Sequence, residues 1–260
     1  MINLLTPNGF VVKVPENQYE DSTPKFDVNL ETDAATKYYK DNGFVIFSSC
    51  VSSKDCDQIR SLWEKSIKPY GGKIYRQTTA KAEKNIFNKN HWIMNPVLNL
   101  QSLNPNLFGD LRKLVEKKIF SNISICKAFR ALLGEKPKIV QSMYFEGNSA
   151  TWEHQDSYYL DSEKTGEMSA GWVALEEIKA KAGRFFICPE SHKIELGKQN
   201  INNNIADNHD KYISEIVSII KSKNMKVKAP YMAMGDVLFW NSWTIHGSID
   251  SQNANFSRSS

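Results

Sequence analysis

Cysteine is scarce in this chain: Cys50, Cys56, Cys126 and Cys188 are the only four among 260 residues, and no two form a Cys-x-x-Cys pair. So low a content excludes a small fold held together by disulfides. We therefore expect reduced and mostly buried thiols, because free cysteine is most often a core residue.

Long hydrophobic runs are also absent. No segment approaches the roughly 18 consecutive apolar residues of a membrane span. The first 15 residues mix Asn3, Asn8, Gly9 and Lys13 with apolar residues, unlike a secretory signal. We expect no membrane partner and a cytoplasmic location.

The chain has no marked excess of one charge: 33 Lys and Arg against 29 Asp and Glu give a net charge of +4. Binding to a nucleic acid backbone usually requires a basic stripe, which so small an excess does not provide. We expect a small-molecule partner and no nucleic acid.

Helical patterns dominate the first half of the chain. Capping residues and apolar spacing predict helices over residues 31–42, 53–68, 106–120 and 121–133. The apolar run Phe44-Val45-Ile46-Phe47 predicts a strand, and the polar segment 72–105 predicts loops.

Strand patterns dominate the second half. Short strands are predicted over residues 140–145, 151–160, 168–178, 184–188, 237–240 and 243–248, with one helix through Ile213, Ile216, Val217 and Ile220. Helices first and strands later indicate an α+β fold around an antiparallel sandwich or barrel. No linker divides the chain, so we expect one domain over residues 1–260, with helical support and lid loops in 1–137 and the sheet core in 138–260.

His154 and Asp156 lie two residues apart, and in a strand that spacing points both side chains to the same face. The pair alone is weak evidence, because such spacings arise often by chance. His246, late in the chain, supplies a third ligand, and its neighbour Gly247 would let a bound molecule approach the backbone. Two histidines and one carboxylate form a facial triad that holds Fe(II) and leaves positions open.

A longer series of motifs surrounds these residues. It comprises Gln141-Ser-Met143, His154-Gln-Asp156, Trp172-Val-Ala-Leu, Gly183, Cys188-Pro-Glu-Ser-His-Lys193, Gly235-Asp-Val-Leu-Phe-Trp240 and His246-Gly-Ser248. Its order and spacing resemble the phytanoyl-CoA dioxygenase family, whose members are Fe(II)- and 2-oxoglutarate-dependent oxygenases on a double-stranded β-helix. The likeness covers residues 139–260.

The resemblance implies that His154, Asp156 and His246 bind the iron. Arg258 would anchor the distal carboxylate of 2-oxoglutarate, since a planar guanidinium makes a two-point contact that lysine cannot. The resemblance further places Ser248 on that carboxylate and Gln141, Met143 and Trp172 along the cosubstrate pocket. Trp172 reads equally well as a core residue.

The implied reaction consumes 2-oxoglutarate and O2, releases succinate and CO2, and hydroxylates a C–H bond. Asp156 favours hydroxylation over halogenation, because its carboxylate occupies the position that a halide would need. The alternative is a non-redox cupin-like binding protein or isomerase that uses the same three ligands.

Some residues depart from the family pattern or lack a role in it. Glu146-Gly147 stands where a basic residue is common, which argues against a coenzyme-A-type substrate. Arg184 either faces outward or meets an anionic substrate, whereas His192 reads as a structural turn residue. Relatives continue beyond the arginine, so an end at Ser260 would leave Arg258 on an unpaired segment.

The polar segment 71–104 is the predicted lid. Its basic, amide and aromatic groups favour a small polar metabolite as substrate.

Overall fold

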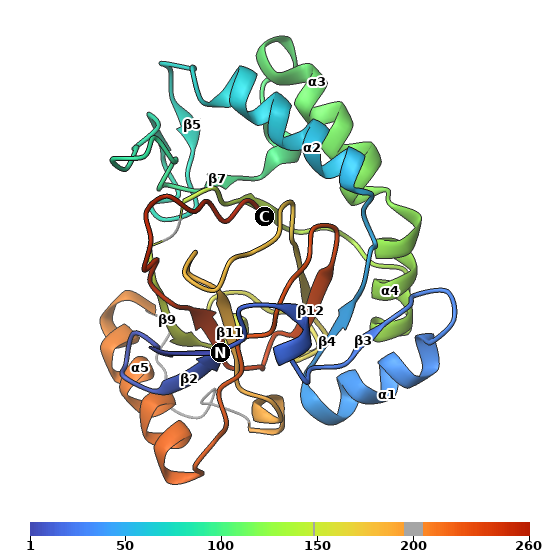
Figure 1. Ribbon diagram of the computed structural model, residues 1–260, viewed down its shortest axis with the longest axis vertical. Coiled ribbons are helices and arrows are strands. Elements are labelled where there is room, and N and C mark those ends of the chain that lie inside the picture. The colour runs from blue at the N-terminus through green and yellow to red at the C-terminus, as the bar shows by residue number, and fades with distance from the viewer. Residues whose placement is uncertain (148, 195–204) are drawn as a thin grey trace.

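The computed structural model describes residues 1–147, 149–194 and 205–260 (Figure 1). Its helices are α1 (Thr32–Asn42), α2 (Ser53–Leu62), α3 (Pro105–Val115), α4 (Ile123–Leu133) and α5 (Ile205–Ser222). Its strands are β1 (Ile2–Leu5), β2 (Val11–Val14), β3 (Lys25–Phe26), β4 (Phe44–Phe47), β5 (Ile74–Tyr75), β6 (Ala82–Glu83), β7 (Val97–Leu98), β8 (Met143–Tyr144), β9 (Thr151–His154), β10 (Ser169–Val173), β11 (Phe185–Ile187), β12 (Val237–Asn241) and β13 (His246–Ser248).

Two sheets form the centre of the molecule. The larger has the strand order β10-β12-β4-β3, antiparallel except for the parallel pair β3 and β4. The smaller has the order β11-β13-β9 and is antiparallel throughout. Strands far apart in sequence are therefore neighbours in both sheets.

The inner faces of the two sheets pack against each other. Trp172 of β10 and Trp240 of β12 contact Phe185 of β11, with ring centroids 6.0 and 4.9 Å apart. Because side chains alternate along a strand, the opposite face of β12 presents Val237 and Phe239 to the helical layer. The larger sheet is thus buried on both faces, which explains the unbroken apolar sequence of β4.

Helices cover the outside of the sheets (Figure 1). α1 and α4 pack against the larger sheet, α2 packs on α3, and α5 packs along β9. α1 ends at Gly43, whose φ of 81° is left-handed, and a Cβ there would lie 2.4 Å from His192 Nδ1. Both the backbone angle and the close contact require glycine at this position.

Most elements agree with the sequence patterns, and the α+β content is confirmed. The predicted helices are present, although two of them end in π-helical turns over Trp63–Ile67 and Glu116–Phe120. Most strands of the second half are shorter than predicted, whereas β12 is one residue longer, and the segment 72–105 contains the short strands β5, β6 and β7. The patterns gave no sign of the hairpin formed by β1 and β2.

The N-terminal residues also contribute to the sheets. β3 and β4 join the larger sheet, and Val12 and Val14 of the hairpin pack on Phe186 and Ile249 outside the smaller one. All four cysteines are free and three are buried, as expected. Among the residues that the structure describes, no helix is both long and apolar enough to cross a bilayer.

Candidate functional site

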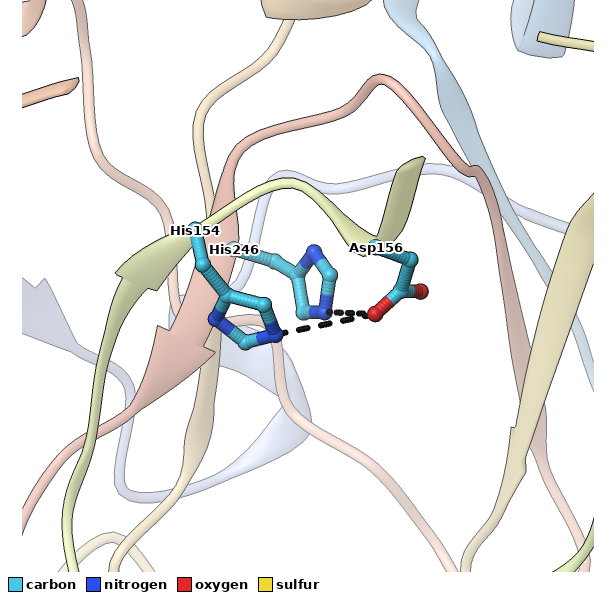
Figure 2. Close-up of side chains that lie close together, drawn as sticks. All are labelled: His154, Asp156 and His246. Carbon is cyan, nitrogen blue, oxygen red and sulfur yellow. Dashed lines mark ion pairs between the residues drawn. The ribbon is translucent and has the colours of Figure 1, made fainter. Parts of the chain in front are cut away.

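His154, Asp156 and His246 meet between the two sheets (Figure 2). β9 and β13 pair so that His154 lies directly opposite His246. β9 ends at His154, but Gln155 keeps an extended backbone with φ −110° and ψ 135°, so Asp156 still points to the same face as His154. The predicted same-face arrangement is therefore correct.

The three side chains converge on a small volume. Asp156 Oδ1 lies 3.6 Å from His154 Nε2 and 3.5 Å from His246 Nε2, and one ligand atom from each residue lies within 4.8 Å of the others. The His246 side chain is 5% exposed, whereas His154 and Asp156 are 13% and 26% exposed. The distances exceed those of good hydrogen bonds and suit three ligands around one ion.

Backbone carbonyls fix the orientation of both imidazoles. His154 Nδ1 lies 2.8 Å from the carbonyl oxygen of Trp152, and His246 Nδ1 lies 2.9 Å from that of Thr244. Since a carbonyl only accepts, each Nδ1 must donate its proton. In the neutral ring each Nε2 then carries a lone pair directed into the site, as a metal ligand requires.

The Asp156 carboxylate is held on its other side. Trp240 Nε1 donates to Asp156 Oδ2 at 2.8 Å and leaves Oδ1 facing the two histidines. Burial opposes the charged form, but the His246 and His154 imidazoles, in their protonated form, outweigh it and hold the pKa of the Asp156 carboxyl far below its usual range. Two imidazole nitrogens and one ionised carboxylate fit Fe(II), with one side of the ion left open.

Arg258 lies in the same interior, and no carboxylate among the described residues forms an ion pair with it. Its guanidinium is buried over the rings of Phe145 and Trp172, 5.5 and 5.9 Å from their centroids, and Nη1 donates to the Gly183 carbonyl at 2.8 Å. Within the part of the chain that the structure describes, Nε has no hydrogen-bond partner. Burial lowers the pKa of Arg258 to about 9. A buried cation with a free donor fits an anionic ligand.

The segment that carries Arg258 is paired on both sides. The Arg258 amide donates to the Glu146 carbonyl at 2.7 Å, and the amides and carbonyls of Ser260 and Phe145 bond reciprocally. On the other side, Leu175 donates to the Ser259 carbonyl, and Ser259 donates to Glu176 Oε1 at 2.6 Å. The expectation of an unpaired segment is wrong, because strand-like bonds hold residues 258–260 in place.

The other predicted cosubstrate residues differ in their placement. Trp172 is buried and contacts Arg258, and Ser248 is buried with its Oγ accepting from the Thr151 amide at 3.0 Å. Gln141 is exposed just before β8, and Met143 is half-buried within it. Their contact with 2-oxoglutarate stays a prediction.

Arg184 has neither of the roles considered for it. It is fully buried, and its Nη1 and Nη2 donate to the carbonyls of Pro15 and Ile178 at 2.7 and 2.6 Å. Arg184 thus fastens the N-terminal segment to the sheet through its two Nη groups, while its Nε has no hydrogen-bond partner among the described residues.

The interpretations of His192 and Gly247 have different outcomes. His192 is structural as predicted, with Nε2 2.9 Å from the Lys40 carbonyl oxygen. The interpretation of Gly247 is wrong: a Cβ there would lie 2.5 Å from the Thr151 carbonyl oxygen and 2.6 Å from Phe186. Strand packing, rather than a bound molecule, requires this glycine.

Sequence reasoning assigned no role to Phe185 and Trp240, which complete the site. Phe185 stacks on His246 at 5.3 Å and contacts Trp172, so it lies between the triad and Arg258. Trp240 ends a motif that the sequence does contain, but only the packing of the two sheets brings its indole to Asp156.

Curated proteins are similar to this chain in sequence. The chain is 24% identical over 230 residues to bovine peroxisomal phytanoyl-CoA dioxygenase. The match covers 82% of this chain and 62% of the bovine protein. The human peroxisomal protein is 22% identical over 241 residues, covering 88% of this chain and 67% of that protein. The chain thus spans about two thirds of the length of these relatives.

Solved structures share the fold at lower identity. The alpha ketoglutarate dependent carbocyclase SnoK from nogalamycin biosynthesis superposes with a TM-score of 0.66 at 17% identity, over 91% of this chain and 84% of the other. EctD from S. alaskensis, solved with 2-oxoglutarate and 5-hydroxyectoine, gives a TM-score of 0.60 at 15% identity, over 95% and 83%.

A family model covers most of the chain as well. The model of the phytanoyl-CoA dioxygenase (PhyH) family matches residues 39–260, which include the triad, Arg258, the smaller sheet and all strands of the larger sheet except β3. This chain belongs to the phytanoyl-CoA dioxygenase family.

Proposed function

We propose that this protein is an Fe(II)- and 2-oxoglutarate-dependent dioxygenase that hydroxylates a C–H bond of a small molecule. The observation that carries the proposal is a metal-binding triad in the same interior as a buried, unmatched guanidinium. Phe185 and Trp172 connect the two through ring contacts. Family membership supports the same activity.

The fold proposed for this activity is a double-stranded β-helix in a single domain over residues 1–260. The two facing sheets would be its halves, and the hydrogen-bonded segment 258–260 would add to the strand pairing. Residues 1–137 would contribute most of the helical support and the lid loops. The cytoplasmic location stays a prediction.

The reaction balances as one substrate C–H, one 2-oxoglutarate and one O2 giving one C–OH, one succinate and one CO2. When bound, Fe(II) supplies the site at which O2 is activated and the keto acid loses CO2. The protein supplies ligands, orientation and a dry interior.

Each side chain has a specific task in this scheme. His154, Asp156 and His246 would hold the metal, and Trp240 would keep the carboxylate in position. Arg258 would bind the distal carboxylate of 2-oxoglutarate, and Ser248 would add a hydroxyl to it. Phe185 and Trp172 exclude water between these groups.

A non-redox metal-binding protein or isomerase is the weaker candidate. Such a protein needs the triad but has no use for a buried guanidinium that forms no ion pair with any described residue. Burying that charge costs free energy, which an anionic cosubstrate would recover.

The test is release of CO2 from 2-oxoglutarate labelled at its first carbon, with Fe(II), O2 and a reductant but no added substrate. The wild-type protein should release CO2 slowly, and Asp156→Ala should release none. Glu163→Ala, which removes an exposed carboxylate, should match the wild type. Release by Asp156→Ala at the wild-type rate, or no release by the wild type at saturating Fe(II), would contradict the proposal.

A further inference from the structure

Aromatic side chains line one side of the triad. Trp152 precedes His154 by two residues on β9 and therefore shares its face, and its side chain is 44% exposed. Tyr159 is 40% exposed, and its ring lies edge-on to the His154 ring at 5.8 Å. His209 of α5 packs edge-on against Trp152 at 5.0 Å. We refer to Trp152, Tyr159 and His209 as the aromatic wall.

The polar atoms of the aromatic wall bind each other. Trp152 Nε1 donates to Tyr159 Oη at 3.4 Å, and Tyr159 Oη lies 2.8 Å from His209 Nε2. The hydroxyl can accept from the indole while donating to a neutral imidazole. These hydrogen bonds use the indole N–H, the tyrosine hydroxyl and the imidazole nitrogen, while Trp152 and Tyr159 remain partly exposed.

A second layer supports the aromatic wall. Tyr158 meets Tyr159 edge-on at 5.0 Å and stacks on the buried Tyr212 of α5 at 3.7 Å with nearly parallel rings. The wall residues therefore have fixed positions, which lowers the entropy lost when a ligand stacks on them. Exposed aromatic surface next to a metal centre is typical of a ligand site.

The predicted preference for a small polar metabolite depended on the segment 71–104, and the one arginine of that segment binds inside the fold. Arg76 is fully buried, and its guanidinium donates to the Asn95 carbonyl at 3.1 Å and to Asn85 Oδ1 at 2.5 Å. Glu146 is likewise buried, with Lys68 Nζ at 2.9 Å. These charged groups are used to hold the segment in place.

We propose that the aromatic wall binds a planar, uncharged ring of the substrate and holds it beside His154. The inference builds on the proposed function, because it assigns the substrate class of the same site. Ring faces attract flat π systems, whereas a flexible acyl chain or a compact polar molecule gains little from them.

The experiment measures binding to the metal-free protein without 2-oxoglutarate, so failure of the dioxygenase proposal does not affect it. The probes are 2-naphthol and its saturated counterpart decahydro-2-naphthol. The readouts are the dissociation constant and the ¹⁵N–¹H signal of the Trp152 indole, assigned by its loss in Trp152→Phe. We expect 2-naphthol to shift that signal and to bind about tenfold tighter than the saturated probe.

Variants separate stacking from a structural role. Trp152→Ala should weaken 2-naphthol binding about tenfold, while Trp152→Phe should retain most of it, since the phenyl ring still stacks. Tyr19→Ala removes a ring that is 90% exposed on the N-terminal segment and should leave binding unchanged. Thermal melting of each variant checks that the fold is intact.

Several results would overturn the inference. These are equal affinity for the planar and saturated probes, unchanged binding in a folded Trp152→Ala, or no binding of 2-naphthol. Tighter binding of octanoyl-coenzyme A than of 2-naphthol, with a shift of the Trp152 indole signal, would assign the surface to an acyl thioester instead.

Discussion

At the scale of single residues, the Trp240 indole determines how Asp156 is presented. Its bond to Oδ2 leaves Oδ1 directed at both histidines, and the indole itself packs 4.9 Å from the His246 ring. A ligand carboxylate without such a partner can rotate away, and its affinity for the metal falls.

Trp240→Phe should therefore weaken metal binding about 10- to 100-fold while the aromatic packing largely remains. Titration of the metal-free protein with Co(II), followed by visible absorption, measures this. Trp172→Phe is the matched control. Trp172 is buried in the same hydrophobic cluster as Trp240, but the indole that donates to Asp156 is that of Trp240. Equal Co(II) affinity in Trp240→Phe and the wild type would refute the role of the indole.

We expect Arg258 to control binding of the cosubstrate and not of the metal. Arg258→Ala should raise the dissociation constant for 2-oxoglutarate about 10- to 150-fold, since a charge-assisted hydrogen bond contributes about 1.5–3 kcal/mol. Arg258→Lys should restore only part of the affinity, because an ammonium group cannot make the two-point contact. Calorimetry with Zn(II) as a redox-inert metal measures the dissociation constants of the metal and of 2-oxoglutarate. An equal loss of affinity for Zn(II) and for 2-oxoglutarate would contradict the assignment.

His192 links stability to pH. Burial lowers the pKa of its imidazole below the usual 6.5, and Nδ1 is buried against Gly43 with no acceptor among the described residues. Because the folded-state pKa is depressed, the unfolded chain takes up the proton first. The contribution of neutral His192 to the unfolding free energy is therefore fully present above about pH 6.5. It is lost as the pH falls through the folded-state pKa.

His192→Gln should accordingly show a smaller loss of unfolding free energy than the wild type between about pH 7.5 and about pH 5. Urea unfolding at both pH values measures the difference. Parallel losses in the two proteins would show that another group is responsible.

At the scale of elements, α5 fixes the segment that carries two of the three triad residues. The Tyr212 hydroxyl accepts from the Gln155 amide at 2.7 Å and donates to the Gln155 carbonyl at 3.2 Å. The Gln155 side chain in turn donates to the carbonyls of Ile194 and Trp243. Gln155 thus joins α5, β9 and the turn before β13.

Tyr212→Phe should lower the unfolding free energy by about 1–3 kcal/mol, since it leaves a buried amide and carbonyl unpaired. It should also weaken Co(II) binding, because the residue between His154 and Asp156 loses its support. Tyr19→Phe, at an exposed site, is the control. Reduced stability with unchanged Co(II) affinity would limit Tyr212 to a structural role.

The sequence predicted elements best where the signal was local. The end of α1 follows from Gly43, and the buried face of α5 follows from Ile216 and Ile220. The β1–β2 hairpin was missed because its four-residue strands are too short to show a period, and they form only where Val12 and Val14 find Phe186.

At the scale of the whole molecule, the predicted triad converges because the pairing of β9 with β13 joins residues 92 positions apart in sequence. The same long-range pairing explains what sequence could not predict. Trp240 reaches Asp156, and Arg184 reaches Pro15, only after the sheets and the N-terminal segment have packed. Neither contact follows from a spacing along the chain.

The central claim concerns a metal and 2-oxoglutarate bound together, and anaerobic titration tests it most directly. Fe(II) followed by 2-oxoglutarate should produce a weak visible absorption band in the wild type and none in Asp156→Ala. Arg258→Ala should need more 2-oxoglutarate to reach the same band. No band in the wild type at saturating Fe(II) and 2-oxoglutarate would contradict the account.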